Sequence, residues 1–464
     1  MADIFISYTK KNKDTARNLF QALSAQWDVW WDDTLVGDYV EEIEAELKAA
    51  QCLIPIWSND SRDSKNVRDE VRIAERQNIP IIPIKIDDCE PPYGFGGYSG
   101  VELIDWGGEN DHPSLVQLKR KISQIIPVRQ KPVRKASLSS LDLSFPALFM
   151  SVSSHETRLP PLDAVRALRL YRAKSILVSA YDLHPKRRPP EILNELEQYR
   201  TNGGIVLIDS GNYEAYRTGD NRWQPQSFWK SIKDVPFDMV FSFDQMSLPI
   251  SVNKSIEKIV LGATRDQIHL QREILPIIHA PISGKKQQVR YDLLPEIIQG
   301  VSKELQPSLI AVPERELGPG LVARAKTVFR IRQALNELPY YQPIHLLGTG
   351  NPWSLAIFTL AGADSFDGLE WCRIVVDRQT GKLHHYQHLD FFMYQMAASS
   401  SELVRVIHQD TKIDYAGKAA FHNLDYFSEF AEELRMKRVD QLIPSLMGKD
   451  NFDQLNEQFP ELFS

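Results

Sequence analysis

The first 127 residues alternate short apolar runs with amphipathic helical segments. The apolar runs are "DIFISY" at residues 3–8, "CLIPIW" at 52–57 and "IPIIPIKI" at 79–86. Between and after them, apolar residues recur at helical spacing in three groups: Ala16, Leu19, Phe20 and Leu23; Val67, Val71 and Ala74; Leu115, Leu118, Ile122 and Ile125. Apolar strands separated by helices predict an α/β domain with a doubly wound parallel sheet.

A second alternation of strand-like runs and helical segments begins near residue 145. Helical segments such as "GLVARAKTVFRIRQALNEL" separate most of the eight strand-like runs, which are "ALFMSV", "SILVSAY", "GIVLIDS", "DMVFSFD", "ILPIIHA", "SLIAVPE", "IHLLGTG" and "SFDG". Eight β/α units in succession predict a (β/α)8 barrel. Residues 400–464 continue with helical patterning and many charged and aromatic residues, which predicts a helical C-terminal region.

The stretch between these two regions differs from both in composition. Residues 128–144, "VRQKPVRKASLSSLDLS", are basic, rich in serine and poor in large apolar side chains. Such a composition is typical of a domain boundary. The predicted organisation is a domain at 1–127, a linker at 128–144, a barrel at 145–399 and a helical region at 400–464, which suits a chain of 464 residues.

Composition limits the classes of function. The formal net charge of −7 argues against broad electrostatic capture of nucleic acid, so a polynucleotide partner has to be argued from a local site. The three cysteines are far apart and form no CxxC pair, which excludes a disulfide framework and a cysteine-rich zinc site. No run approaches the roughly 18 apolar residues of a membrane span. We expect a cytoplasmic protein without a membrane partner.

Several motifs of the first domain occur together and in one order: "DIFISY", "WDVWWDD", "TLVGDYV", "CLIPIWS" and "SKNVRDEV". Together they resemble a bacterial Toll/interleukin-1 receptor (TIR) domain, which has a flavodoxin-like fold. That family includes adaptors, which only associate, and enzymes that cleave the nicotinamide–ribose bond of NAD+. The resemblance implies that Glu70 is the catalytic carboxylate, which would stabilise the oxocarbenium-like charge on the ribose.

The same resemblance implies further roles in the first domain. Tyr8, Asp33, Gly37 and Ser58 fall in cleft or loop segments and are candidates for binding NAD+, which is a substrate here and not a cofactor. Each of the four is also interpretable as a turn or packing residue, and Glu70 as a solvated helix residue. The family often has a tryptophan where this chain has Asn66. Self-association between TIR domains is expected.

Three aspartates follow strand-like runs of the predicted barrel. Asp209 ends "GIVLID", Asp244 ends "DMVFSFD", and Asp367 lies in "SFDG". All three would therefore lie at the carboxyl ends of the strands, where barrel enzymes keep their chemistry. Asp209 is also interpretable as the capping residue of the turn "DSGN". Asp364 is expected to close the loop before Asp367.

Five segments of this region come in the order of one family: "SILVSAYDLHPKRRP", "IDSGNYEAY", "FSFDQM", "LIAVPERE" and "HLLGTGNPWSLAIFTLAGADSFDG". Over residues 145–375 they resemble the tRNA-guanine transglycosylases (queuine tRNA-ribosyltransferases), which exchange guanine for a 7-deazaguanine base. The resemblance implies that Asp367 attacks the ribose C1′, Asp209 handles a proton and Asp244 reads the base. Asp367 and Asp209 could equally be remnants of a lost activity. Met246, His279 and Glu314 complete the implied base pocket.

The chain also departs from that family. The family's zinc-binding cysteines are missing because only Cys372 lies in the corresponding part, so no zinc is expected. Met246 and His279 replace a cysteine and a glutamine, and Ser308, Leu309 and Pro313 replace glycines. Base recognition should therefore differ, since proline offers no backbone N–H. The basic segments "HPKRRP" and "GKKQQVR" are candidates for phosphate contact or are merely solvated.

Three hypotheses follow. In the first, the TIR domain is an NAD+ glycohydrolase that acts as an antiphage-type effector, controlled by a barrel that senses a nucleobase, a nucleoside or a nucleic-acid feature. In the second, the barrel is a transglycosylase that inserts a 7-deazaguanine-type base into RNA or DNA, and the TIR domain is an association module. In the third, neither site turns over and the protein is an adaptor.

Overall fold

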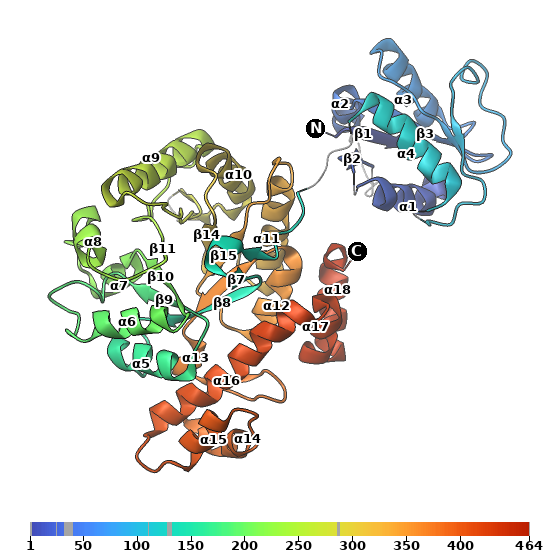
Figure 1. Cartoon of the computed structure of the whole chain (residues 1–464). Helices are drawn as coiled ribbons and strands as arrows, with labels where there is room; N and C mark the ends of the chain where they lie inside the picture. The colour runs from blue at the N-terminus through green and yellow to red at the C-terminus, as the bar shows by residue number, and fades with distance from the viewer. Residues whose placement is uncertain are drawn as a thin grey trace. The chain divides into compact units, whose positions relative to one another are not determined.

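The computed structural model describes residues 2–24, 26–31, 40–109, 111–127, 132–284 and 288–463. The chain divides into two compact units, residues 1–131 and 132–464 (Figure 1). Each unit has its own hydrophobic cores. No helix within the described ranges is long and apolar enough to cross a membrane.

The first unit is built on a parallel sheet with the strand order β2-β1-β3-β4-β5. The strands are β1 (Ile4–Ser7), β2 (Val29–Trp30), β3 (Cys52–Trp57), β4 (Ile84–Lys85) and β5 (Val101–Glu102). In register, Ile4 of β1 pairs with Val29 on one side and with Cys52 on the other. This order is that of the flavodoxin-like fold, as the sequence predicts.

Both faces of this sheet are buried, because side chains alternate between two cores along each strand. Cys52, Ile54 and Ile56 of β3 pack with α1 (Lys13–Ser24) and α4 (Pro113–Ile125). Leu53 and Trp57 pack on the opposite face with α2 (Val40–Ala49) and α3 (Lys65–Arg76). A strand buried on both faces reads as a continuous apolar run, which is why "CLIPIW" shows no polar alternation.

The second unit is a parallel β-barrel. Seven of its strands form one sheet in the order β11-β10-β9-β8-β16-β15-β14. They are β8 (Ala147–Val152), β9 (Ser175–Ser179), β10 (Ile205–Asp209), β11 (Met239–Val240), β14 (Ile310–Pro313), β15 (Ile344–Leu347) and β16 (Ser365–Gly368). The segment around Leu275 and Ile277 closes the ring, since it forms parallel bridges to Phe241 at one edge and to Ala311 at the other. All eight predicted strand-like runs therefore take part in the barrel.

Helices surround the ring of strands (Figure 1). In chain order they are α5 (Pro161–Tyr171), α6 (Ile192–Thr201), α7 (Asn212–Thr218), α8 (Pro225–Ile232), α9 (Val252–Leu270), α10 (Leu294–Leu305), α11 (Leu321–Leu335), α12 (Pro352–Ala361) and α13 (Glu370–Arg373). Phe149, Leu207 and Phe241 point into the barrel, whereas Met150, Val206 and Val240 pack against the helices. The alternation along each strand thus separates an inner core from an outer one.

Part of the predicted linker belongs to the barrel. Residues 132–144 contain a small antiparallel hairpin of β6 (Ser137–Leu138) and β7 (Leu143–Ser144). Leu138 and Leu143 are buried beside Ala147, the first residue of β8, in the inner core. These two leucines seal the end of the barrel at which the strands begin, so this stretch is a structural part of the second unit. Residues 128–131 lie outside the described residues.

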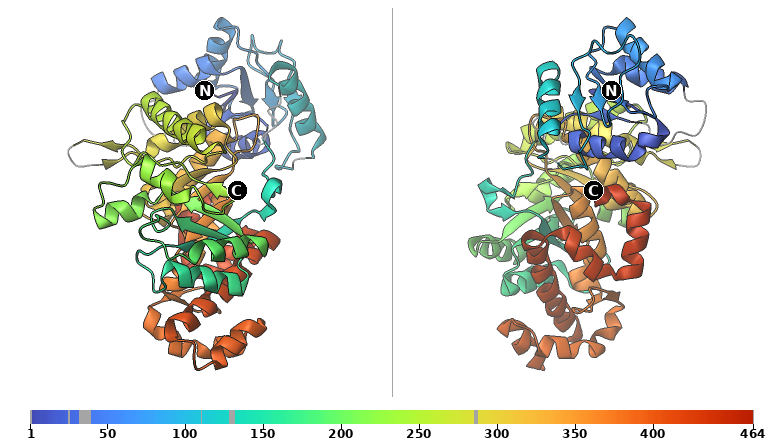
Figure 2. Two further views of the ribbon diagram at one scale, coloured as in Figure 1. Left: turned by 60° about the vertical axis from the view of Figure 1, so that its left-hand side comes forward. Right: turned by 90° about the vertical axis from the view of Figure 1, so that its right-hand side faces the viewer.

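The C-terminal region is helical, as predicted. It contains α15 (Glu402–Gln409), α16 (Tyr415–Met436), α17 (Val439–Met447) and α18 (Lys449–Gln458), of which α16 to α18, red in both views of Figure 2, lie along the outside of the barrel. Before them come the hairpin of β17 (Val375–Val376) and β18 (Leu383–His384) and helix α14 (Met393–Ala397); another hairpin, β12 (Ile282–Ser283) with β13 (Gln288–Val289), precedes α10.

A buried amide attaches α16 to the chain that follows the last barrel strand. Asn423 donates hydrogen bonds to the carbonyls of Trp371 (3.1 Å) and Ile374 (2.6 Å) and accepts one from the Val376 N–H (3.0 Å). The C-terminal helices are therefore an integral layer of the barrel domain.

Candidate functional site

Glu70 lies on α3 near the carboxyl end of the first sheet. Helix α3 begins after Ser64, whose side chain accepts a hydrogen bond from the Val67 N–H, and it buries Val67, Val71 and Ala74 against the sheet. Glu70 is half-buried on the flank of this buried stripe. The hydroxyl of Ser7, the last residue of β1, donates a hydrogen bond to Oε2 of Glu70. The carboxylate is thus tied to the end of the neighbouring strand.

This position is a topological switch point of the sheet. In the strand order 2-1-3-4-5, ligands bind in the crevice beyond the carboxyl ends of β1 and β3. Tyr8 directly follows β1, and Ser58 directly follows β3. The structure therefore brings Glu70, Tyr8 and Ser58 to the same edge of the sheet. Asp33 and Gly37 lie outside the described residues.

Ser58 and Tyr8 have contacts within the fold as well. The Ser58 hydroxyl donates to Oδ1 of Asn12 (2.9 Å), and its backbone N–H donates to the Ser61 hydroxyl (2.7 Å). The ring of Tyr8 lies 5.9 Å from that of Trp31, centroid to centroid. Ser58 shapes the turn after β3, whereas Tyr8 is half-buried beside it. Asn66, one turn before Glu70, is exposed.

The barrel holds a cavity of about 310 Å³ at the carboxyl ends of its strands. That volume is at the lower end of the range for small-molecule pockets, about 300 to 1,000 Å³. All six barrel residues predicted from sequence line it: Asp209, Asp244, Met246, His279, Glu314 and Asp367. Pro313, which replaces a glycine of the family pattern, is also part of its wall.

Asp367 reaches the cavity because it occupies an inward position of β16, between the outward Phe366 and Gly368. Its Oδ2 accepts a hydrogen bond from the Ser151 hydroxyl (2.7 Å). Its Oδ1 accepts one from the Gly348 N–H (2.9 Å) and lies 3.3 Å from Nε2 of the buried His345. Gly348 has φ +76°, a left-handed conformation that favours glycine, and this turn directs its N–H at the carboxylate. The carboxylate of Asp367 is therefore held in one orientation.

Asp209 is in a different electrostatic environment. Burial raises the pKa of its carboxyl well above the ordinary value, and the nearby carboxylates of Glu214 and Asp244 raise it further. Its Oδ2 accepts a hydrogen bond from the Gly211 N–H (3.1 Å), so Asp209 also caps its turn, as one interpretation of the sequence had it. The raised pKa makes this carboxyl better suited to giving a proton to a departing base than an ordinary aspartate is.

Asp244 forms part of a buried charge chain. Its Oδ2 lies 2.6 Å from Nε2 of His279, whose Nδ1 lies 2.9 Å from Oε1 of Glu316. Its Oδ1 accepts a hydrogen bond from the Asn212 side chain (2.6 Å). Burial lowers the pKa of His279, but the hydrogen bonds to Asp244 and Glu316 outweigh it and raise the pKa to about 10. Burial likewise raises the pKa of Asp244, but His279 outweighs it and the net pKa is lowered. His279 is thus an imidazolium that keeps Asp244 ionised.

Three further carboxyl groups line this cavity that were not predicted from the sequence: Glu156, Glu214 and Glu370. Oε1 of Glu214 accepts a hydrogen bond from Ser153 (2.6 Å), but its Oε2 is buried without a hydrogen-bond partner among the described residues. Oε2 of Glu370 is also buried without such a partner. A Cβ on Gly350 would lie 1.7 Å from that oxygen, so the Glu370 carboxyl fits only because this neighbour is glycine.

Asp364, three residues before Asp367, lies at the opposite end of the barrel. It is fully buried, and its carboxylate accepts hydrogen bonds from Arg332 (2.8 Å), Arg134 (3.0 Å), Tyr341 (2.6 Å) and the Ile344 N–H (2.9 Å). It therefore joins α11, β15 and the segment before β6 at the amino ends of the strands. Asp364 has a structural role, as expected. Its hydrogen bonds connect several segments at this end of the barrel and are not confined to its own loop.

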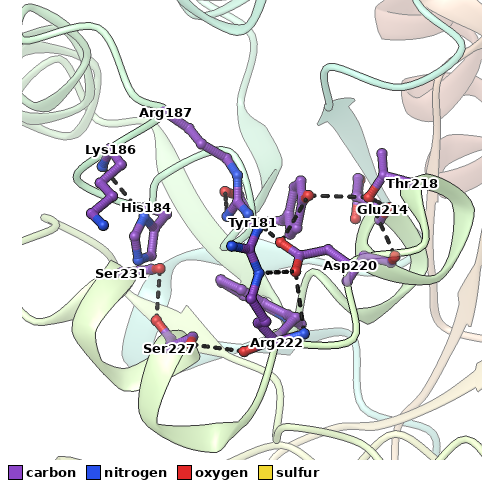
Figure 3. Close-up of polar contacts among 12 residues, drawn as sticks. Tyr181, His184, Lys186, Arg187, Glu214, Thr218, Asp220, Arg222, Ser227 and Ser231 are labelled. Atoms are coloured by element: carbon purple, nitrogen blue, oxygen red, sulfur yellow. Dashed lines mark hydrogen bonds and ion pairs between the residues drawn. The ribbon is translucent and has the colours of Figure 1, made fainter.

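The basic segment "HPKRRP" forms the loop after β9, shown in Figure 3. The guanidinium of Arg187 stacks over the ring of Tyr181 at 3.7 Å and donates to Oδ2 of Asp220 (2.6 Å). Arg222 donates to the other oxygen of Asp220 (3.1 Å). Arg187 and Lys186 are both exposed, but the guanidinium of Arg187 is held by its ion pair with Asp220.

Cys372 lies on the short helix α13, after the last barrel strand. Its thiol is buried and lies 3.1 Å from the Thr157 hydroxyl, and burial raises its pKa to about 12. Across the part of the chain that the structure describes, no three His, Cys, Asp or Glu side chains are grouped so as to hold a metal ion.

Comparison with known proteins gives one match for each unit. Residues 4–120 match the TIR domain family. The tRNA-guanine(15) transglycosylase of Nanoarchaeum equitans (strain Kin4-M) is 24% identical over 244 residues, which cover 52% of this chain and 56% of that protein. The chain thus spans little more than half the length of this relative.

Proposed function

We propose that this chain, which joins a TIR domain to a tRNA-guanine transglycosylase-like domain, cleaves the nicotinamide–ribose bond of NAD+ in its TIR domain. The observation that carries the proposal is the placement of Glu70 at the β1/β3 switch point, with Ser7 donating to its carboxylate. A crevice at this point is suited to a dinucleotide, and a fixed carboxylate there can act on its ribose.

The chemistry needs little more than this carboxylate. As the bond breaks, nicotinamide leaves with the bonding electron pair and becomes neutral, and positive charge develops at the ribose C1′. The ionised Glu70 stabilises this charge more in the transition state than in the bound substrate. Water then adds at C1′, and the products are ADP-ribose, nicotinamide and one proton.

The test is nicotinamide release from NAD+ by the purified full-length chain, in the wild type and in Glu70→Gln. Glu75→Gln is the matched control, since Glu75 lies on the same helix but is exposed and hydrogen-bonded to Tyr98. Loss of release in Glu70→Gln alone supports the proposal. Equal release in all three proteins would refute it.

The barrel serves as the sensor in this proposal. A nucleobase, nucleoside or nucleic-acid feature bound in its cavity switches on the TIR domain, which acts by self-association as an antiphage-type effector in the cytoplasm. The acidic lining of the cavity supports a nucleobase as the ligand, because the ring N–H and amino groups of a base can donate hydrogen bonds to carboxylate oxygens. Nicotinamide release should therefore rise when the correct ligand is added, together with the mass of the particle in light scattering.

A second function is favoured by a specific observation. Asp367 is oriented by hydrogen bonds to both of its oxygens, and Asp209, with its raised pKa, lines the same cavity. This pair suits base exchange: Asp367 would attack the ribose C1′ of a nucleotide in RNA or DNA while Asp209 protonates the departing base. Incorporation of labelled guanine or a 7-deazaguanine into RNA or DNA that disappears in Asp367→Asn would support it. The TIR domain would then be an association module.

A further inference from the structure

Charges in the barrel cavity are separated by depth. Seven acidic residues line it: Asp209, Glu214, Asp244, Glu314, Asp367 and Glu370, together with the more exposed Glu156. Two arginines, Arg315 and Arg373, also line it, and Arg217 of α7 is connected to Arg373 through Glu156. We call Arg217, Arg315 and Arg373 the mouth arginines, because Arg315 is exposed and the side chains of Arg217 and Arg373 are 44% and 41% exposed. A ligand that suits both parts carries hydrogen-bond donors at one end and an anion at the other.

Three buried side-chain oxygens of residues that line the cavity have no hydrogen-bond partner among the described residues, and one of them is the Ser179 hydroxyl. Oε2 of Glu214 and Oε2 of Glu370 are buried without a hydrogen-bond partner among the residues described, although other atoms of both residues line the cavity. Buried polar atoms are almost always hydrogen-bonded in folded proteins, so three such oxygens in one cavity need an explanation. Donors from a bound ligand would satisfy the two glutamate side chains.

The outer part already holds a carboxylate between two guanidiniums. Oε1 of Glu156 lies 2.8 Å from Arg217, and its Oε2 lies 3.3 Å from Arg373. Arg217 also donates from Nε to Nε2 of His155 (3.2 Å). A phosphate group, with three or more acceptor oxygens, can replace a carboxylate in such a bridge and bind both guanidiniums in the same way.

Two features indicate that Glu156 is a replaceable occupant. Its backbone has φ +56°, a left-handed conformation uncommon for a residue with a side chain, and such conformations concentrate at functional sites. Its side chain is 39% exposed, so it can leave the bridge for water. The third guanidinium, Arg315, lies 4.9 Å from the centroid of the Tyr213 ring, another residue of the cavity wall.

We propose that the mouth arginines form an anion subsite, and that the ligand of the barrel is a phosphorylated nucleoside whose phosphate displaces Glu156 while its base donates to Glu214 and Glu370. The proposal rests on the barrel being a nucleobase or nucleoside sensor and names the ligand class of that site. The phosphate can belong to a free nucleotide or to a nucleic-acid strand. Glu156 then competes with the ligand for the arginines, so it limits the affinity.

Isothermal titration of the full-length chain with the common nucleosides, their 5′-monophosphates and short single-stranded oligonucleotides tests this. For at least one base, the monophosphate should bind at least about tenfold more tightly than the nucleoside, since two charge-assisted contacts are gained. Arg373→Ala should remove this advantage. Glu156→Ala should increase the affinity for the monophosphate severalfold and leave that for the nucleoside unchanged, a gain that a merely structural glutamate would not give. Tighter binding of the oligonucleotide than of the monophosphate would show that the phosphate belongs to a nucleic-acid strand.

Arg222→Ala is the matched control, because Arg222 is a highly exposed arginine of the region in Figure 3 and does not line the cavity. If Arg222→Ala and not Arg373→Ala removes the phosphate advantage, the anion site lies elsewhere and the proposal fails. Equal affinity for nucleoside and monophosphate also overturns it but leaves the sensor role standing. Nicotinamide release measured on the same samples reports separately on the TIR domain, and a panel in which nothing binds would refute both the subsite and the sensor.

Discussion

The two carboxylate sites of this chain lie in equivalent places of two different sheets. Both are at the carboxyl ends of parallel strands, where α/β folds leave a crevice for ligands. In the TIR domain, Glu70 is half-buried and accepts a hydrogen bond from the Ser7 hydroxyl. In the barrel, seven acidic residues line one cavity, and burial together with repulsion between carboxylates raises the pKa of Asp209 and Glu370.

This difference separates two kinds of chemistry. A single ionised carboxylate can stabilise a positive charge on a ribose whose leaving group is already cationic. A crowded acidic cavity is suited to recognising a donor-rich ligand or to moving a proton, because burial and repulsion raise the pKa of some of its carboxyls. This contrast supports our proposal that NAD+ is turned over at the first site and that a ligand is recognised at the second.

The largest expected effect tests whether the two sites belong to independent units. Asp364→Asn removes a buried charge that faces Arg332 and Arg134, and loss of one partner of a buried ion pair typically costs about 3–5 kcal/mol. Hydrogen exchange should show faster opening of the barrel strands and unchanged exchange within residues 2–127. Asp142→Asn, which removes an exposed ion pair with Lys174, should change stability by less than about 1 kcal/mol. An equal increase of hydrogen exchange in both units would show that they do not unfold independently.

A smaller effect is expected at the TIR site. Ser7→Ala removes the hydrogen bond to Glu70, and a hydrogen bond to a charged group contributes about 1.5–3 kcal/mol, which corresponds to roughly 10- to 150-fold in the rate of nicotinamide release. The loss should appear in kcat more than in KM if Ser7 only orients the carboxylate. Ser123→Ala, which removes an exposed hydroxyl on α4 that donates to the Arg120 carbonyl, is the control. An unchanged kcat in Ser7→Ala would show that Glu70 needs no such support.

The smallest effect concerns the crowded cavity itself. The folded-state pKa of Asp209 is raised, so its contribution to stability is full below the ordinary value of 3.8 and is lost as the pH rises through the raised pKa. Asp209→Asn cannot ionise. The variant should therefore be more stable than the wild type at pH 7, by about 0.5–2 kcal/mol, and the gain should vanish near pH 4. Urea unfolding at the two pH values measures this, and a gain independent of pH would contradict the raised pKa.

Strand alternation explains why much of the barrel site is predictable from the sequence. Asp209 and Asp367 are separated by even numbers of residues from Leu207 and Ser365 on their own strands, so all four point inward. Once the apolar runs are recognised as strands, an aspartate at an inward position near the carboxyl end has to face the cavity. The eight strand-like runs likewise predicted the barrel fold.

Residues that come from loops and short helices could not be predicted in this way. Glu316 and Glu370 follow their strands by a few residues, and no periodicity tells which way such side chains turn. The partners of Asp364 could not be predicted either. Asp364 directly precedes β16, and its partners Arg134 and Arg332 are 230 and 32 residues away in the sequence. Long-range ion pairs of this kind leave no local signal. A weak signal did exist at residues 138 and 143, where two leucines in a polar stretch belong to the barrel core.

The central claim is that Glu70 cleaves NAD+ and that the barrel carboxylates do not. The most direct measurement is nicotinamide release by the full-length Glu70→Gln and Asp367→Asn variants, each at saturating NAD+ and with the same panel of nucleotides. We expect Glu70→Gln to lose release by about 10²- to 10⁴-fold, with Asp367→Asn retaining it at the wild-type level in at least one condition. Release that survives in Glu70→Gln and disappears in Asp367→Asn would contradict the account.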